Sequence, residues 1–458
     1  MLKIQNPATG QLLAEVPEAT AEIVAERTRA ARAAQPAWFA TPFEQRLQVM
    51  LRFRVAVAAE LEVLAVTLTS EVGKPIRQSR NELNGLLGRI DFFLTQAQAT
   101  LAPQQVFDEG GMRERISFDP LGVVVNISAW NYPYFVGGNV FVPALLAGNA
   151  VLYKPSEYAT LTGLHIARLL HESGVPVDVF VPLVGGGAVG AALLAQAVDG
   201  VFFTGSHATG ARIAAAVGPR FIKLQLELGG KDPTYVCDDL NGADLQAAAE
   251  SLADGAMYNA GQSCCSVERI YVHERIHDAF VAAFVEAVRG FRLGDPMNED
   301  TYISALTRAP QLAVLEAQVA DAKARGATLR IGGARIDQPG NWFEPTVFTE
   351  VDHTMELMRE ESFGPIIGIQ KVSGDAQALA LMNDTRYGLT AGVFTRDEAR
   401  AQAILSKVNA GTVYWNCCDR VSPRLPWSGH GDSGVGLTLS TYGIQTFTRP
   451  RAWHLRQP

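Results

Sequence analysis

Two segments of the chain carry residues suited to proton transfer and thiol chemistry. Glu227 lies beside paired glycines in residues 226–231 (LELGGK), and Cys264 follows a Gly-Gln pair in residues 259–265 (NAGQSCC). Only a thiolate attacks, so a nucleophilic cysteine needs surroundings that help it ionise. A carboxylate that takes a proton from water needs a partly dry site, which raises its pKa towards neutrality. The two segments predict a thiol nucleophile and a general base.

Two further segments suit the binding of a nucleotide. Residues 203–210 (FTGSHATG) are predicted to close a strand and open a helix, where Gly205 and Ser206 would let a pyrophosphate approach the helix N-terminus. An ordinary tight turn is the alternative. Lys154 and Glu157 end another predicted strand and could hold a ribose diol, although a surface ion pair has the same pattern.

Two more segments have both a chemical and an ordinary interpretation. Asn131 follows a valine-rich strand and could donate to a developing oxyanion, or it could be a turn asparagine with its partners satisfied. Residues 360–365 (EESFGP) hold two carboxylates and an aromatic ring, or form an ordinary turn.

The composition limits the class of protein. The chain has 458 residues, of which 48% are hydrophobic and 19% charged, so we expect two to four domains with large cores and no long disordered tail. A net charge of −8 argues against a nucleic-acid partner. The N-terminus lacks the pattern of a secretory signal, and no apolar run approaches the length of a membrane span. We therefore expect a soluble, cytoplasmic protein.

The cysteines predict neither disulfides nor a metal site. They are few and odd in number, unlike a disulfide framework. Two adjacent pairs occur, but zinc ligands are usually separated by two to four residues. The five are Cys237, Cys264, Cys265, Cys417 and Cys418.

Hydrophobic periodicity predicts an α/β protein. Helical patterns over 20–39, 43–71 and 79–100 form an N-terminal helical layer. Short apolar strands then alternate with helices, which predicts a doubly wound parallel sheet, and the alternation begins again after Glu227. The predicted strands are 121–128, 150–154, 177–184, 200–204, 269–272, 390–395 and 411–416, and the predicted helices are 134–147, 160–173, 187–197, 240–260, 277–288, 309–325 and 376–383.

Two peripheral segments fit neither α/β unit. Both alternate polar and apolar residues, so they are predicted to pair as a small β-flap whose edge could support self-association. The expected division is residues 1–101 with 121–226 as a dinucleotide-binding domain, 227–438 as a catalytic domain, and 102–120 with 439–458 as the flap.

Taken together and in this order, the segments resemble those of the aldehyde dehydrogenase superfamily across essentially the whole chain. The resemblance implies two doubly wound parallel-sheet domains, a Rossmann-like cofactor domain and a catalytic thiol domain, plus the β-flap. It rests on residues 120–133, 154–157, 203–210, 226–231, 261–265, 360–365 and 426–436.

The resemblance also implies a role for each matching residue. Cys264 would be the nucleophile, Glu227 the base that activates water, and Asn131, with the backbone N–H of Cys264, the oxyanion donor, whereas Cys265 would not act. The implied cofactor-binding residues are Lys154 and Glu157 at the adenosine ribose, Gly205 and Ser206 at the pyrophosphate, Glu361 at the nicotinamide ribose, and Phe363 and Trp130 near the ring.

The implied reaction is oxidation of an aldehyde to an acid with NAD or NADP, through a thiohemiacetal and a thioester on Cys264. Glu157 predicts NAD over NADP, because a carboxylate at the ribose repels a 2′-phosphate. A CoA-acylating enzyme is one alternative and would not need Glu227, and a non-catalytic protein on the same fold is another. We expect a homodimer or homotetramer, with no nucleic acid, membrane or metal partner.

The substrate is less constrained. Expected tunnel residues favour a medium-sized apolar or aromatic aldehyde, whereas Arg420 could pair with the carboxylate of a semialdehyde. Asn139-Val140 and Leu437-Thr438 stand where the family often has Trp-Lys and Arg-Glu, and Thr441 stands where it often has a glutamate. These departures are expected at the rim and the subunit contacts. The tunnel candidates are Tyr132, Phe135, Tyr258, Ser263 and Cys418.

Overall fold

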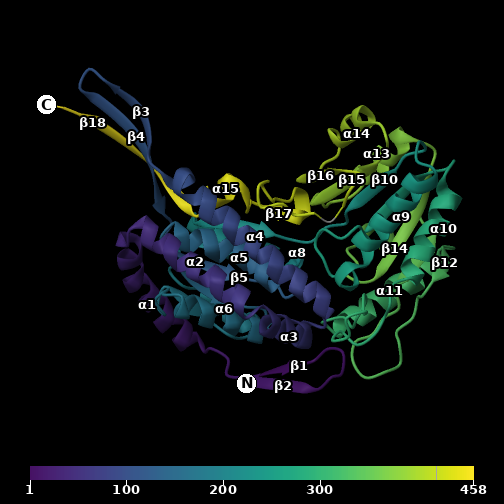
Figure 1. Cartoon of the computed structure of the whole chain (residues 1–458), viewed down its shortest axis with the longest axis horizontal. Helices are drawn as coiled ribbons and strands as arrows, with labels where there is room; N and C mark the ends of the chain where they lie inside the picture. The colour runs from purple at the N-terminus through teal and green to yellow at the C-terminus, as the bar shows by residue number, and fades with distance from the viewer. Residues whose placement is uncertain (419, 458) are drawn as a thin grey trace.

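The computed structural model describes residues 1–418 and 420–457. Two α/β lobes lie side by side, and a narrow β-arm projects from the N-terminal lobe (Figure 1). The first lobe contains a six-stranded sheet of order β17-β9-β8-β5-β6-β7. Its strands are β5 (Val123–Ile127), β6 (Ala150–Lys154), β7 (Phe180–Pro182), β8 (Gly200–Thr204), β9 (Lys223–Glu227) and β17 (Gly434–Val435).

Eight helices belong to this lobe. They are α1 (Ala21–Ala40), α2 (Phe43–Ala59), α3 (Leu61–Val72), α4 (Ile76–Leu101), α5 (Pro133–Leu146), α6 (Thr160–Glu172), α7 (Gly187–Leu194) and α8 (His207–Val217).

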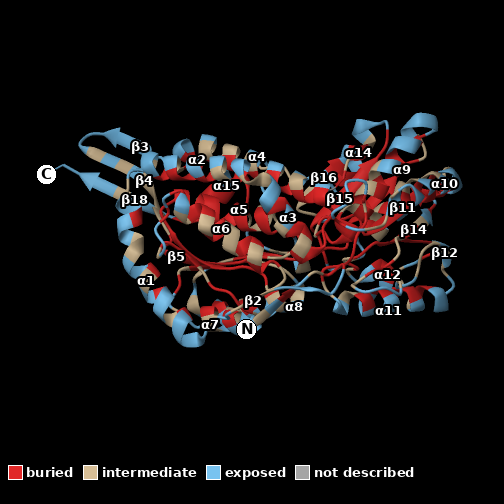
Figure 2. Cartoon of the chain, turned by 60° about the horizontal axis from the view of Figure 1, so that its bottom comes forward, coloured by how far each residue is buried: buried red, intermediate tan, exposed pale blue. Residues whose placement is uncertain are grey.

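Alternating residues of the central strands supply two hydrophobic cores. Val124 packs with α2 to α6 on one face of the sheet, and its neighbours Val123 and Val125 pack with α1, α7 and α8 on the other. Figure 2 shows these strands buried between helices. Because both faces are covered, the strands are continuous apolar runs. The predicted doubly wound parallel sheet is confirmed, with β17 as an antiparallel edge.

The predicted helix over 43–71 is wrong in one respect, because it is two helices. Glu60 leaves helical geometry with ψ of 12° between α2 and α3. Its carboxylate is bonded by Arg168 of α6. The apolar spacing continues across Glu60, so the sequence pattern did not reveal the turn there. The ion pair between Glu60 and Arg168 stabilises this turn.

The second lobe contains a seven-stranded sheet of order β12-β13-β14-β11-β10-β15-β16, in which only β12 is antiparallel to its neighbour. The second α/β unit agrees with the prediction, although the sequence analysis did not predict strands β10, β12, β13 and β14. The strands are β10 (Pro233–Val236), β11 (Arg269–His273), β12 (Thr328–Ile331), β13 (Thr346–Thr349), β14 (Ile366–Val372), β15 (Thr390–Phe394) and β16 (Thr412–Trp415). The helices are α9 (Gly242–Met257), α10 (His277–Arg289), α11 (Pro310–Ala324), α12 (Glu356–Arg359), α13 (Asp375–Asn383) and α14 (Glu398–Leu405).

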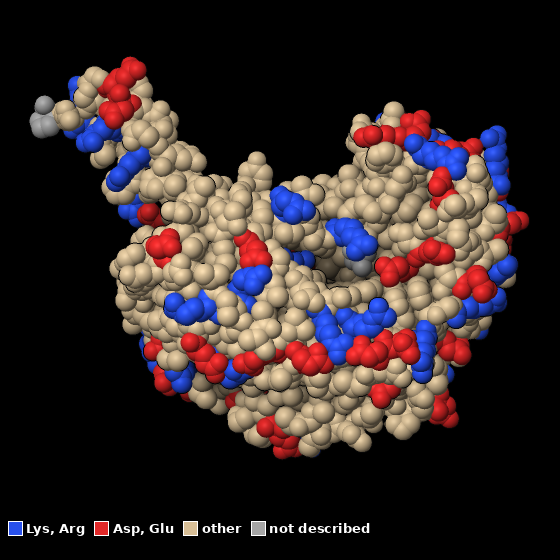
Figure 3. All heavy atoms as spheres, in the orientation of Figure 1, with Lys and Arg blue, Asp and Glu red and all other residues tan. Residues whose placement is uncertain are grey.

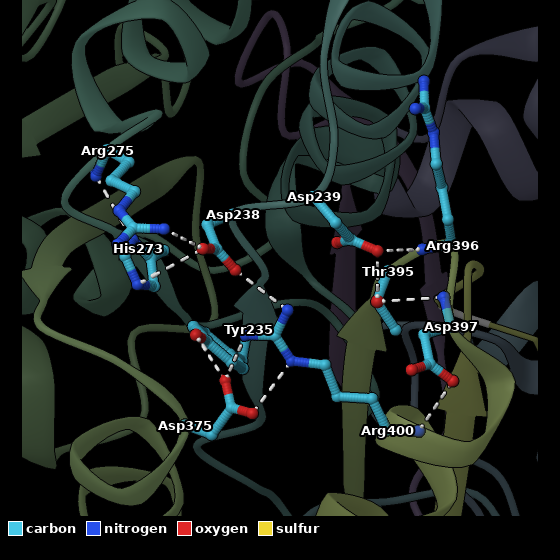
Figure 4. A network of polar contacts seen from close by, with 10 residues as sticks. All are labelled: Tyr235, Asp238, Asp239, His273, Arg275, Asp375, Thr395, Arg396, Asp397 and Arg400. Atoms are coloured by element: carbon cyan, nitrogen blue, oxygen red, sulfur yellow. Dashed lines mark hydrogen bonds and ion pairs between the residues drawn. The ribbon is translucent and has the colours of Figure 1, made fainter.

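The carboxyl edge of the second sheet is filled by its own side chains. Open α/β sheets bind ligands outside the carboxyl ends of the strands where the strand order reverses, here between β10 and β15. Arg400 donates there to Asp238 at 2.9 Å and to Asp375 at 2.5 Å, and Thr395 donates to Asp239 at 2.8 Å (Figure 4). This polar network occupies the carboxyl edge of the second sheet between β10 and β15.

The peripheral strands pair as predicted. Strand β4 (Met112–Pro120) lies between β3 (Gln104–Glu109) and β18 (Thr448–Arg456), with Thr448 opposite Pro120. This arm stands away from both lobes (Figure 1) and exposes Val106 and Phe107. The remaining elements are β1 (Leu2–Gln5), β2 (Leu12–Val16) and α15 (Ser440–Gln445).

All five cysteines carry free thiols. Within residues 1–418 and 420–457, no helix combines the length and apolar character of a membrane span, and no cluster of His, Cys, Asp and Glu is arranged to hold a metal ion.

Candidate active site

The candidate site lies where the carboxyl edge of the first sheet meets the amino edge of the second. Glu227 is the last residue of β9, and the chain then turns through residues 229–231 into β10. The loop that carries Cys264 leads into β11, and the loop 360–365 leads into β14. Since β10, β11 and β14 are parallel neighbours, all three loops reach the same edge.

An unusual backbone presents Cys264. Asn259 and Ala260 have φ of 53°, and Gly261 has φ of 69°. A side chain at Gly261 would place its Cβ 2.1 Å from the carbonyl oxygen of Gly364, so only glycine fits. Left-handed residues outside glycine are strained and concentrate at functional sites. The loop leaves Cys264 partly exposed on a cavity of about 690 Å³.

The neighbouring Cys265 has a different environment. Its side chain is buried in the core of the first lobe, and its sulfur lies 3.4 Å from Oγ of Ser263. Both cysteines line the cavity, but they differ in accessibility, because Cys264 is partly exposed whereas Cys265 is 4% exposed.

Asn131 is held against the thiol loop. Its amide Nδ2 donates to the carbonyl of Gln262 at 3.2 Å. Nδ2 of Asn259 donates to the same carbonyl at 3.2 Å and to the carbonyl of Asn131 at 3.4 Å. These bonds bring the end of the segment after β5 next to the cysteine, although the two lie 133 positions apart in the sequence.

Glu227 has the protonation behaviour expected of a base. It lines the same cavity as Cys264, and burial raises its pKa to about 7, although Thr438 and Arg89 act in the opposite direction. The hydroxyl of Thr438 donates to Oε1 of Glu227. Desolvation penalises the charged form of a carboxyl, so this group titrates near neutrality.

A buried ion pair ties the site loops together. Nζ of Lys231 lies 2.5 Å from Glu268, and neither side chain is more than 5% exposed. Glu268 also accepts from the backbone N–H of Ser362 at 3.0 Å and of Phe363 at 3.1 Å, while Lys231 donates to Oγ of Ser362 at 3.0 Å. One carboxylate therefore joins the turn after Glu227, the entrance to β11 and the loop before β14.

Glu361 folds onto the glycine pair. Its Oε1 accepts from the N–H of Gly230 at 3.2 Å, and a Cβ at Gly229 would lie 2.1 Å from its carboxylate. Desolvation is the main cause that raises its pKa to about 8. The adjacent Phe363 packs edge-on against Trp130, with ring centroids 5.5 Å apart.

The carboxyl edge of the first sheet fits a dinucleotide. Lys154 ends β6 in a buried position, with Nζ 3.5 Å from the half-exposed carboxylate of Glu157. Burial lowers the pKa of Lys154. Gly205 follows β8, and Ser206 precedes α8 without capping it, which leaves N–H donors of the first turn available to an anion. An ammonium, a carboxylate and a helix N-terminus suit the ribose and pyrophosphate of NAD(P).

Four of the five tunnel candidates line the cavity, as does Arg420. Cys418 is the exception, and its prediction is wrong. Its sulfur packs against Gly255 and donates to the carbonyl of Ser251 at 3.3 Å, inside the core of the second lobe. The four that line the cavity are Tyr132, Phe135, Tyr258 and Ser263.

Two departures from the family pattern contact catalytic candidates or line the cavity, and do not lie at the rim as expected. Asn139 lines the cavity and accepts from Arg89 at 2.7 Å, and the buried Thr438 donates to Glu227. Sequence reasoning did not identify Arg89. Its signal was available, because it falls three residues after Leu86 and one before Ile90 on the apolar face of α4.

Comparisons with known proteins agree on one family. The family model described as the aldehyde dehydrogenase family matches residues 1–453. A Mycolicibacterium smegmatis protein named "Putative succinate-semialdehyde dehydrogenase (NADP(+))" is 37% identical, over 97% of this chain and 87% of that protein. A betaine aldehyde dehydrogenase of Cereibacter sphaeroides is 34% identical, over 97% and 92%. The crystal structure of an NAD-dependent aldehyde dehydrogenase from Sinorhizobium meliloti superimposes with a TM-score of 0.96 at 33% identity, covering 100% of this chain and 92% of that one.

The Lys231–Glu268 pair should contribute strongly to the free energy of unfolding. We expect Glu268→Leu to lower the free energy of unfolding by about 3–5 kcal/mol, because it leaves a buried ammonium without its carboxylate. The double variant Lys231→Met/Glu268→Leu should recover part of that loss. Urea denaturation of the two single variants and the double variant measures the coupling. Simple additivity of the two single effects would contradict the role given to this pair.

Proposed function

The chain belongs to the aldehyde dehydrogenase family, and we propose that it oxidises an aldehyde to the carboxylic acid through a thioester on Cys264 that a water activated by Glu227 hydrolyses. The observation that carries this proposal is that Cys264 and Glu227 line one cavity. One is a partly exposed thiol, and the other a carboxyl whose pKa burial raises to about 7.

The proposed steps use the chain's own groups. The Cys264 thiolate attacks the aldehyde carbon, and the resulting alkoxide accepts hydrogen bonds from the Asn131 amide and the backbone N–H of Cys264. A nicotinamide bound beside Cys264 would supply the hydride acceptor for this oxidation, so the carbon held on Cys264 would be left as a thioester. Glu227 then takes a proton from water, the hydroxide adds to the thioester, and the thiolate leaves as the acid forms. The oxygen added to the product therefore comes from water.

The proposed cofactor contacts come from the carboxyl edge of the first sheet and from the loops at the amino edge of the second. Lys154 and Glu157 would hold the adenosine ribose, Gly205 and Ser206 the pyrophosphate, and Glu361 the nicotinamide ribose. Trp130 and Phe363, whose rings touch each other, would pack beside the nicotinamide. We propose that NAD is preferred over NADP, because the half-exposed carboxylate of Glu157 stands where a 2′-phosphate would add negative charge.

Hydrolysis is favoured over transfer to CoA. A CoA-acylating enzyme releases its thioester to an external thiol and needs no base for water. The burial that raises the pKa of Glu227 to about 7 supports the hydrolytic reaction. Formation of acyl-CoA that depends on added CoA would favour the alternative.

We also propose a division of the chain and a self-association surface. Residues 1–101 with 121–226 form the cofactor domain, 227–438 the catalytic domain, and 102–120 with 439–458 the flap. Strand β3 exposes Val106 and Phe107 on the projecting arm, which supports a homodimer or homotetramer built on the flap.

The adjacent cysteines offer a matched pair of variants. We expect Cys264→Ala to abolish aldehyde-dependent NADH formation, since it removes the nucleophile. Cys265→Ala should retain most of the activity, because Cys265 is buried in the core. NADH absorbance with a panel of aliphatic, aromatic and ω-carboxylated aldehydes measures both. If Cys264→Ala lowered the activity only slightly and Cys265→Ala abolished it, Cys265 would be the nucleophile instead of Cys264.

Loss of the base should separate acylation from hydrolysis. We expect Glu227→Gln to give one burst of NADH per site, followed by turnover slowed about 100-fold or more. For the unmodified enzyme, kcat should rise with pH through about 7, because Glu227 acts in its deprotonated form. Mass spectrometry of the quenched variant should find the acyl group on Cys264. Steady turnover without accumulated acyl-enzyme would remove Glu227 from this role.

Cofactor preference should depend on Glu157. We expect kcat/KM to favour NAD in the unmodified enzyme, and Glu157→Gln to raise kcat/KM for NADP while changing that for NAD less, because the variant removes a charge that repels the 2′-phosphate. Steady-state kinetics with both cofactors at one fixed aldehyde concentration measures the ratio. Glu172→Gln is a matched control on the exposed end of α6 and should leave the ratio unchanged. A clear preference of the unmodified enzyme for NADP would overturn this expectation.

A further inference from the structure

A buried arginine occupies the wall of the substrate cavity. Arg89 is 6% exposed and comes from α4, which also places Gln78 and Glu82 on the cavity wall. Arginine is seldom buried without a carboxylate partner, because removing its charge from water is costly. Among the residues that the structure describes, no carboxylate forms an ion pair with Arg89. It keeps its charge all the same, since burial lowers its pKa only to about 10.

Neutral partners hold the guanidinium in place and leave part of it free. Its Nη1 donates to Oδ1 of Asn139 at 2.7 Å, and its plane lies 3.9 Å from the ring centroid of Phe135. Asn139 and Phe135 both belong to α5, and all three residues line the cavity. A guanidinium has five N–H donors. The structure therefore fixes one edge and one face of Arg89, and the remaining donors serve the cavity.

Acids also line the cavity, and Glu227 and Glu82 interact electrostatically with Arg89. Of the lining acids, Glu82 is bonded to the buried Lys74, and Glu227 has a pKa near 7. Asp254 accepts from the hydroxyl of Tyr302. Arg420 and Arg424 add two more cations at the exposed end of the cavity. Figure 3 shows Lys and Arg side chains gathered around the hollow between the two lobes. The lining of the cavity that contains Cys264 thus holds three arginines and three acids, with Arg420 and Arg424 at its exposed end.

We propose that Arg89 binds a carboxylate at the far end of the substrate, so that the enzyme acts on aldehydes bearing a terminal carboxylate. This inference rests on the proposed function, because it names the substrate class of the same site. Arginine suits the task, since its planar donors match a carboxylate in a bidentate pair. The aromatic rings of Tyr132, Phe135 and Tyr258 would contact the carbon chain between the two ends. Arg420 and Arg424, at the mouth, attract the anion before it reaches Arg89.

The test compares a charged aldehyde with a neutral one of similar shape. The probes are 4-oxobutanoate and its methyl ester, and the readout is the ratio of their kcat/KM values measured by NADH absorbance. We expect the unmodified enzyme to favour the carboxylate, and Arg89→Met to lower that ratio by about 10- to 100-fold, as expected for the loss of a charged hydrogen-bonded pair. Arg89→Lys should keep part of the preference, because it keeps the charge but loses the bidentate geometry.

Further variants separate the possible outcomes. Arg289→Met, on an exposed helix of the second lobe, is the matched control and should leave the ratio unchanged. Arg420→Met and Arg424→Met should change it less than Arg89→Met does, and the reverse order would move recognition to the mouth and overturn the proposal. An equal loss for both probes in Arg89→Met would show a purely structural role and also overturn it.

If Arg89→Met folds but has too little activity for kinetics to be compared, inhibitor binding tests the proposal instead. Glutarate should inhibit the unmodified enzyme competitively against the aldehyde, and Arg89→Met should weaken that inhibition by a similar factor. Unchanged inhibition would contradict the proposal. The absence of NADH formation from every aldehyde tested with the unmodified enzyme would instead refute the proposed function, so the two failures are distinguishable.

Discussion

The buried pair of Lys231 and Glu268 is the interaction on which the site depends. Removing two charges from water is costly, and a pair of this kind is retained only when further hydrogen bonds satisfy it. Here Ser362 and Phe363 donate their backbone N–H groups to the same carboxylate. The pair sets the spacing between the glycine turn after Glu227 and the loop of Glu361. The bond from the N–H of Gly230 to Glu361 and that from Arg269 to the carbonyl of Lys231 add to it, so the three loops are joined at several points.

The meeting of two sheet edges explains how one chain brings a thiol, a base and a cofactor edge together. The first sheet ends its strands at the site, so helix N-termini and strand-end side chains face a dinucleotide. The second sheet begins its strands there, so the loops before β10, β11 and β14 carry the remaining groups. The opposite edge of the second sheet is closed by Arg400 and its aspartates. Cys264 and Glu227 line the cavity at the meeting of the two edges, which is where we propose that the chemistry takes place.

Low polarity inside the cavity acts on its charged groups in a consistent way. It raises the pKa of Glu227 and of Glu361, because desolvation disfavours a carboxylate. It also strengthens the attraction between Arg89 and any anion that enters, since charges interact more strongly away from water. In the proposed reaction, the low polarity that raises the pKa of the base would therefore also strengthen discrimination by substrate charge.

The sequence by itself determined the alternation of strands and helices, the paired flap and the two segments with Glu227 and Cys264, because periodicity and local motifs are properties of short stretches. It also located four of the cavity residues. Only the tertiary structure decided that Cys418 packs in a core, that the helical run over 43–71 breaks at Glu60, that Asn139 reaches the cavity and that Thr438 bonds Glu227. Arg89 belongs to the same class, since it lies on α4 and meets α5 and the thiol loop only after folding. Which residues share a low-polarity space depends on contacts between distant segments, and no local pattern encodes those contacts.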